Sequence, residues 1–202
     1  MKFISAVLLA FLVSGSAFAG FDDVEIVSNL RGEYVLGILV SDQREGVLKW
    51  DAKENLIGAH HSGMFRSRKD LLTGSEGPVS DEMLEGLRKE FSKRWLTVAP
   101  LSSTSKDSNE AIGIKIRKAK LHRSFVVTVH SIWVEAPYKG DTTINYGLTV
   151  SIMNDAAVVL ARKTYEGISQ STQWGYWGAT EIFGTLMSSA LADPEITNAL
   201  LK

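Results

Sequence analysis

The chain has 202 residues, a formal net charge of -1 and no cysteine. The absence of cysteine excludes a disulfide framework, a thiolate metal site, a cysteine nucleophile and the acylated cysteine of a bacterial lipoprotein. With 45% hydrophobic and 22% charged residues, the composition is that of a folded globular protein. The near-neutral charge argues against nucleic acid as a partner, because phosphate binding needs a basic face.

Residues 1–19 have the pattern of a signal peptide. Lys2 supplies a positive charge, residues 3–13 form an apolar segment, and Ala17-Phe18-Ala19 is a small-residue cleavage site. The apolar segment is roughly half of the ~20 residues that cross a bilayer. We therefore predict a signal peptide over 1–19 and a single domain over 20–202, without a transmembrane segment in the mature chain. This predicts a periplasmic or secreted protein.

The first half of the mature chain predicts two strands and a helix. The apolar run at 35–40 is bounded by polar residues, which is typical of a strand buried on both faces. A turn or hairpin leads to a second strand at 55–59. Ser80 is a candidate N-cap, and apolar residues at helical spacing predict an amphipathic helix over 81–95, with Pro100 beyond its end.

The second half predicts a meander followed by helix. From Ala111 the apolar period changes to two, which predicts a strand, because Ile112, Ile114 and Ile116 alternate with Gly113, Lys115 and Arg117. Three further strands are expected, at 125–133, 148–152 and 158–165. Apolar residues at helical spacing then predict a helix over 179–191.

Asp193 is the expected cap of a last short helix, with Pro194 at its first position. This order of elements predicts an α+β fold with a mostly antiparallel sheet and two main helices packed on one face.

Motifs that carry chemistry are absent from the sequence. It contains no G-x-S-x-G, no P-loop and no G-x-G-x-x-G, so we predict no nucleotide cofactor. The four histidines do not have the spacing of a zinc site, and we predict no metal. A pair of facing carboxylates is neither shown nor excluded by the sequence.

Two groups of residues are candidate binding surfaces. Three aromatics before the last long helix either cover the core or contact a partner or glycan; they are Trp174, Tyr176 and Trp177. Five basic residues either face water or form a patch for anionic lipid headgroups or a glycan; they are Lys115, Arg117, Lys118, Lys120 and Arg123.

The run Val35-Leu36-Gly37-Ile38-Leu39-Val40-Ser41-Asp42-Gln43-Arg44, followed by Ile57-Gly58 and the helix from Ser80, resembles the YajG-type family of bacterial envelope lipoproteins. The resemblance covers residues 35–192 and implies an α+β envelope protein with no established reaction. The family's lipidated cysteine is absent, so membrane anchoring does not carry over. Asp42 and Arg44 match the motif, and we interpret them as structural residues that bond the following turn.

The sequence favours a non-catalytic exported envelope protein that binds a protein, lipid or glycan partner. Two alternatives stay open. One is a periplasmic hydrolase with an Asp/Glu/Ser/His site, and the other is a structural subunit of an envelope assembly.

Overall fold

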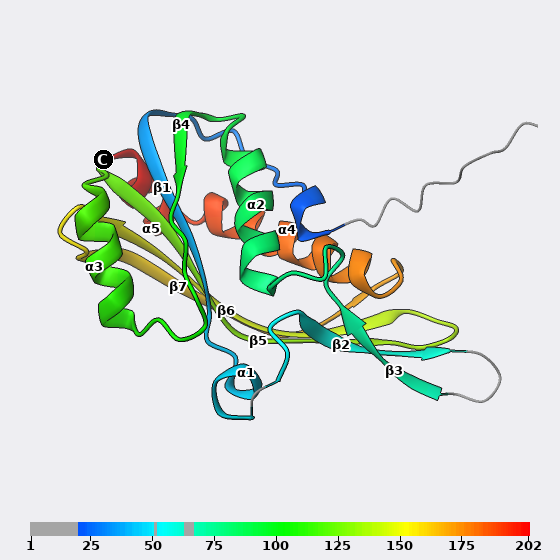
Figure 1. Cartoon of the computed structure of the whole chain (residues 1–202). Coiled ribbons are helices and arrows are strands. Elements are labelled where there is room, and N and C mark those ends of the chain that lie inside the picture. The colour runs from blue at the N-terminus through cyan, green and yellow to red at the C-terminus, as the bar shows by residue number, and fades with distance from the viewer. Residues whose placement is uncertain (1–19, 51, 63–66) are drawn as a thin grey trace, which may run out of the picture.

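The computed structural model describes residues 20–202, except residue 51 and residues 63–66, so the predicted signal peptide lies outside the described residues. Within this part of the chain, seven strands form one sheet that curls around a helical layer (Figure 1). The strands are β1 (Gly32–Asp42), β2 (Leu56–Ser62), β3 (Ser67–Leu72), β4 (Trp95–Pro100), β5 (Arg123–Ala136), β6 (Thr142–Asn154) and β7 (Val159–Ser171). The helices are the 3-10 turn η1 (Phe21–Asp23), α1 (Glu45–Trp50), α2 (Val79–Phe91), α3 (Asn109–Ala119), α4 (Tyr176–Ala192) and α5 (Pro194–Leu201).

The sheet is mixed, and the prediction of a mostly antiparallel sheet is wrong. β5 is the long central strand: its first half pairs in parallel with β1, and its second half pairs in parallel with β2. β1 also pairs in parallel with β4. The antiparallel pairings are β2 with β3, β5 with β6 and β6 with β7. The predicted meander is therefore confirmed for β5, β6 and β7, but these are only three of the seven strands of the sheet.

Helices cover both faces of the sheet, so the prediction of two main helices on one face is also wrong. α2, α4 and α5 pack on the face that contains Phe125 and Val127, whereas α3 packs on the opposite face against Leu39 and Val126. Figure 1 shows α3 separated from α2 and α4 by the sheet. The side chains of β1 are buried on both faces from Leu36 onward, as its apolar run predicts.

The segment predicted as a strand from Ala111 is the helix α3. Ile112 and Ile116 are buried while Ile114 is exposed, because residues four apart share one face of a helix. Ser108 caps the helix by accepting a hydrogen bond from the Ala111 amide at 3.2 Å. The alternating isoleucines thus fit both periods, and the cap identifies the helix.

The boundaries of α2 also differ from the prediction. Its N-cap is Pro78, and Ser80 lies buried inside the first turn. The helix ends at Phe91, and the buried Trp95 begins β4 instead of continuing the helical stripe. Asp193 does cap α5, accepting a hydrogen bond from the Glu195 amide at 2.9 Å, as expected.

Asp42 and Arg44 form a buried ion pair at the carboxyl end of β1. Arg44 contacts the Asp42 carboxylate through Nε at 2.9 Å and Nη2 at 2.7 Å. It also donates to the backbone carbonyls of Glu54, at 2.8 Å, and Leu56. The pair therefore ties the end of β1 to the chain that leads into β2.

Candidate functional site

The N-terminal segment, residues 20–31, runs between α2 and α4 before it enters β1 (Figure 1). Two helical glycines let it approach closely. A Cβ on Gly86 of α2 would lie 2.0 Å from the Phe21 carbonyl oxygen, and one on Gly184 of α4 would lie 2.3 Å from that of Glu25. Phe21 is buried against the rings of Tyr176 and Phe183. The segment is therefore packed as part of the helical layer that α2 and α4 form on this side of the sheet.

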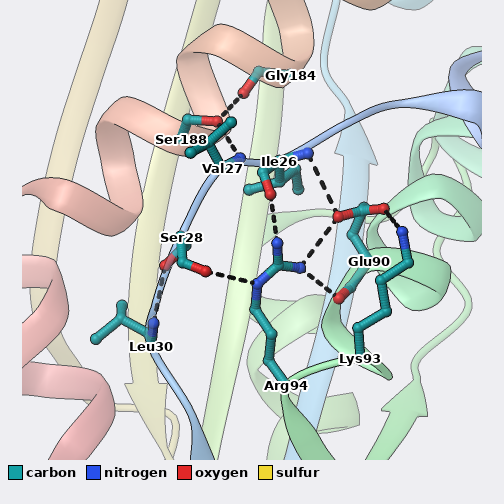
Figure 2. A network of polar contacts seen from close by, with 9 residues as sticks. All are labelled: Ile26, Val27, Ser28, Leu30, Glu90, Lys93, Arg94, Gly184 and Ser188. Carbon is teal, nitrogen blue, oxygen red and sulfur yellow. Dashed lines mark hydrogen bonds and ion pairs between the residues drawn. The ribbon is translucent and has the colours of Figure 1, made fainter.

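A charged network at the end of α2 holds the backbone of this segment (Figure 2). Arg94 donates to the carbonyl oxygens of Ile26 and, at 3.2 Å, Ser28. The buried Glu90 accepts from the Ile26 amide at 3.4 Å, from Lys93, and from Arg94 at 3.1 Å. Although burial raises it, the pKa of Glu90 is lowered overall because these donors stabilise the carboxylate.

Helix α4 holds the segment from the other side. Ser188 Oγ accepts a hydrogen bond from the Val27 amide at 2.9 Å and donates to the Gly184 carbonyl at 2.7 Å (Figure 2). Because the backbone is fixed on both sides, the side chains of the segment are held beside the outer face of α4.

A groove of about 900 Å³ lies between this segment and the outer face of α4. Its helical lining residues recur at spacings of three and four, which places them on one side of α4. The lining consists of Asp23, Glu25, Val27, Gln173, Trp177, Thr180, Glu181, Thr185, Ser188, Ser189 and Ala192.

The groove combines one large aromatic with polar walls. Trp177 is 45% exposed and is the aromatic residue in the lining. Around it are hydroxyl groups, the Gln173 amide and three carboxylates, and no lysine or arginine is among the described lining residues. Glu181 is oriented by the Ser171 hydroxyl, which donates to its carboxylate at 2.5 Å. Such a surface can stack a flat or cyclic ligand on the indole and hydrogen-bond it around its edge.

The structure separates the three aromatics that the sequence groups together. Trp174 is 43% exposed but lies outside the groove, with its ring edge-to-face with His60 at 5.5 Å. Gly175, at φ 54°, turns the chain between Trp174 and the start of α4. Tyr176 is only 6% exposed and belongs to the core. Trp177 alone of the three lines the groove.

Tyr176 instead joins α4 to α2. Its hydroxyl donates to the buried Glu82 carboxylate and accepts from the Phe21 amide. Burial, together with the bond to Glu82 and its charge, raises the pKa of Tyr176 far above its usual value. The hydroxyl is therefore a fixed internal bridge and is out of reach of a partner.

The five basic residues lie in α3, at its C-cap and at the start of β5, and not on one strand. Lys115 pairs with Asp107 at 2.5 Å, and Arg123 donates to the Ala199 carbonyl at 2.8 Å. Arg117 and Lys118 are exposed in the last turn of α3, and Lys120 is its C-cap. Cations in the last turn of a helix complement its dipole, and the patch for an anionic ligand stays a prediction.

A second, smaller pocket of about 320 Å³ lies beside the start of α2 and the loop after β4. Glu54 and Asp81 both line it, and partial burial together with the charge of Glu54 raises the pKa of Asp81. Ser105 donates to the Glu54 carboxylate at 2.5 Å. This pair of carboxylates comes from elements far apart in the chain, and no sequence spacing signals it.

The histidine doublet points to both faces of β2, as a strand requires. His60 contacts the Trp174 ring, and His61 hydrogen-bonds Glu135 at 2.7 Å. Within the described ranges, no three histidine or carboxylate side chains converge so that they could hold a metal ion. Nor is any helix there long and apolar enough to cross a membrane.

No protein-family model matches the chain, and no curated protein matches it. Several solved structures are similar to it. A Xanthomonas campestris protein of family DUF330 is 10% identical over 88% of each chain, with a TM-score of 0.48. The PelC dodecamer from Paraburkholderia phytofirmans is 11% identical over 89% of this chain and 95% of that one, with a TM-score of 0.44.

Lipoprotein GNA1162 from Neisseria meningitidis is 11% identical over 83% of this chain and 99% of its own, with a TM-score of 0.34. The similar structures thus include a bacterial lipoprotein. At these identities and scores they assign neither a family nor a function, and the YajG-type likeness stays a resemblance of sequence motifs.

Proposed function

We propose that this chain is a non-catalytic, exported bacterial envelope protein that binds a glycan in the groove along α4. The observation that carries the proposal is the half-exposed Trp177 set among hydroxyl, amide and carboxylate groups. The periplasmic or secreted location rests on the signal-peptide pattern of residues 1–19.

The lining favours a glycan over the other two classes of partner. A sugar ring has an apolar face that stacks on an indole and a rim of hydroxyls that pair with Thr, Ser, Gln and carboxylate groups. An anionic lipid headgroup would need cations, and none is among the described lining residues. An acyl chain would need a continuous apolar wall, whereas Val27, Trp177 and Ala192 are separated by polar residues.

The experiment is titration of the purified chain with N-acetylglucosamine oligomers and, separately, with vesicles that contain anionic phospholipid. Trp177→Ala is expected to weaken oligosaccharide binding by about tenfold, as removal of a central aromatic does. Trp174→Ala is the matched control, because that indole is equally exposed but lies outside the groove.

An equal loss of oligosaccharide affinity in both variants would contradict the glycan groove. So would a protein that binds the vesicles saturably but does not bind the oligomers. Capture of an envelope protein through Trp177 would favour the protein-partner alternative.

A second candidate is hydrolysis at the smaller pocket, favoured by the approach of Glu54 and Asp81. A carboxylic acid whose pKa is raised beside a second carboxylate is the arrangement used in general acid catalysis. Release of reducing ends from a polysaccharide substrate, lost in both Glu54→Gln and Asp81→Asn, would support it. Activity that survives both substitutions would exclude this pocket.

A further inference from the structure

The outer edge of β7 is unpaired along a long strand. Among the strands that the structure describes, β7 pairs with β6 alone, and it does so from Val159 to Ser171. Every second backbone N–H and C=O of such an edge points away from the sheet and is free to pair with another strand. The edge is therefore a template for strand addition.

One face of this edge carries a symmetric pattern of side chains. The even-numbered residues from Arg162 to Ile168 are all exposed. The odd-numbered ones face the helices: Tyr165 packs on the core and Lys163 pairs with Asp193 of the α5 cap at 3.2 Å. On the exposed face, Arg162 and Glu166 lie two residues to either side of Thr164. The pairing with β6 shifts by one residue between Ala161 and Val159, so Leu160 is not part of this alternation, and it lines a pocket beside α5.

We propose that β7 is a self-complementary interface, and that two copies of this chain pair edge to edge, antiparallel, with Thr164 on the two-fold axis. In that register Arg162 faces Glu166 of the second copy, and symmetry repeats the contact. Residues on one face that lie directly opposite in an antiparallel pair are in contact. The 70% exposed Ile168 lies on the same face, two residues beyond Glu166.

Neighbouring symmetric registers lose this match. Centring the pair on Lys163 sets Arg162 against Thr164, and centring it on Tyr165 sets Arg162 against Ile168. Charged side chains on an edge usually protect it from pairing with another chain. Here opposite charges sit at equal distances from one residue. Arg162 has an additional hydrogen bond to Ser151 at 3.3 Å that orients it on this face.

The first test is sedimentation equilibrium of the purified chain over micromolar concentrations. Glu166→Arg or Arg162→Glu should each weaken the dimer about tenfold or more, because two attractive contacts become repulsive. The charge-swapped double variant should restore it. A monomer at all concentrations, or a double variant no better than either single one, would overturn the proposal, provided that circular dichroism shows the native fold.

The second test uses the absence of cysteine from the natural chain. Residues opposite each other in an antiparallel pair have Cα atoms about 4.5–5.5 Å apart, within the range of a disulfide. Thr164→Cys should therefore give a disulfide-linked dimer on mild oxidation. Gln170→Cys is the control, because it lies on the same exposed face but opposite residue 158 of the second copy. Equal cross-linking of the two variants would refute this register.

Discussion

The close approach of the N-terminal segment to α4 makes Gly184→Ala an informative substitution. The added Cβ would lie 2.3 Å from the Glu25 carbonyl oxygen and 3.1 Å from Val24. Atoms in ordinary contact are about 3.5 Å apart or more, so the segment must retreat by about 1 Å. Overpacking of this kind costs about 1–3 kcal/mol. The retreat also weakens the hydrogen bonds from Arg94, worth about 1.5–3 kcal/mol each when intact.

Alanine also has a higher helix propensity than glycine, by about 1 kcal/mol, and Gly113→Ala isolates that gain. A Cβ on Gly113 of α3 meets nothing closer than 3.5 Å. We expect urea unfolding to show Gly184→Ala destabilised by about 1–3 kcal/mol and Gly113→Ala stabilised by about 0.5–1 kcal/mol. Hydrogen exchange should accelerate at the Ile26 and Val27 amides in the first variant alone. A Gly184→Ala protein as stable as Gly113→Ala, with unchanged exchange, would refute the packing argument.

Three further predictions concern buried and capping contacts. Arg44→Met should destabilise the protein by about 3–5 kcal/mol, since it leaves the Asp42 carboxylate buried without its partner; a shift in the urea midpoint measures this. Tyr176→Phe removes the hydroxyl that bridges Glu82 and the Phe21 amide, and should cost about 1–3 kcal/mol in thermal unfolding. Asp193→Asn should lower stability at neutral pH and have no effect in strong acid. The bond from Lys163 holds the pKa of Asp193 below its unfolded value, so its contribution is present above that value and is lost as the pH falls through the folded one.

Local patterns predict the local elements of this fold. Two-sided burial identifies β1, alternation identifies β5 to β7, and an aspartate before proline marks the start of α5. α3 was misassigned because Ile112 and Ile116 satisfy a period of two as well as a helical face.

The parallel pairings of β1 could not be predicted from the sequence. Its neighbours in the sheet lie 60 or more positions away along the chain, as the pairing of Gly32 with Trp95 shows. A hairpin can be recognised from its turn, but a crossover connection leaves no such signal.

The same limit applies to the candidate site. The sequence singles out Trp177 because it is a large aromatic in a glycine-rich stretch. It does not separate Tyr176 from it, since the burial of Tyr176 depends on Glu82 in a distant helix. The acidic wall of the groove was missed entirely. Residues 20–31 have no periodicity, and their place depends on Glu90, Arg94 and Ser188.

Because β1 lies between β4 and β5 in the sheet, its position limits when it can pair as the chain is synthesised. Its partners are residues of β4 and of the first half of β5, so a chain that emerges N-terminus first has no strand for β1 to join until β4 has appeared, and pairing on the other edge of β1 waits until Val129. The apolar run at 35–40 must therefore wait, unpaired and prone to association. The hairpins of β5 to β7 close over short loops and can form rapidly once made. Folding is thus expected to begin in the second half of the chain and to recruit the first half afterwards.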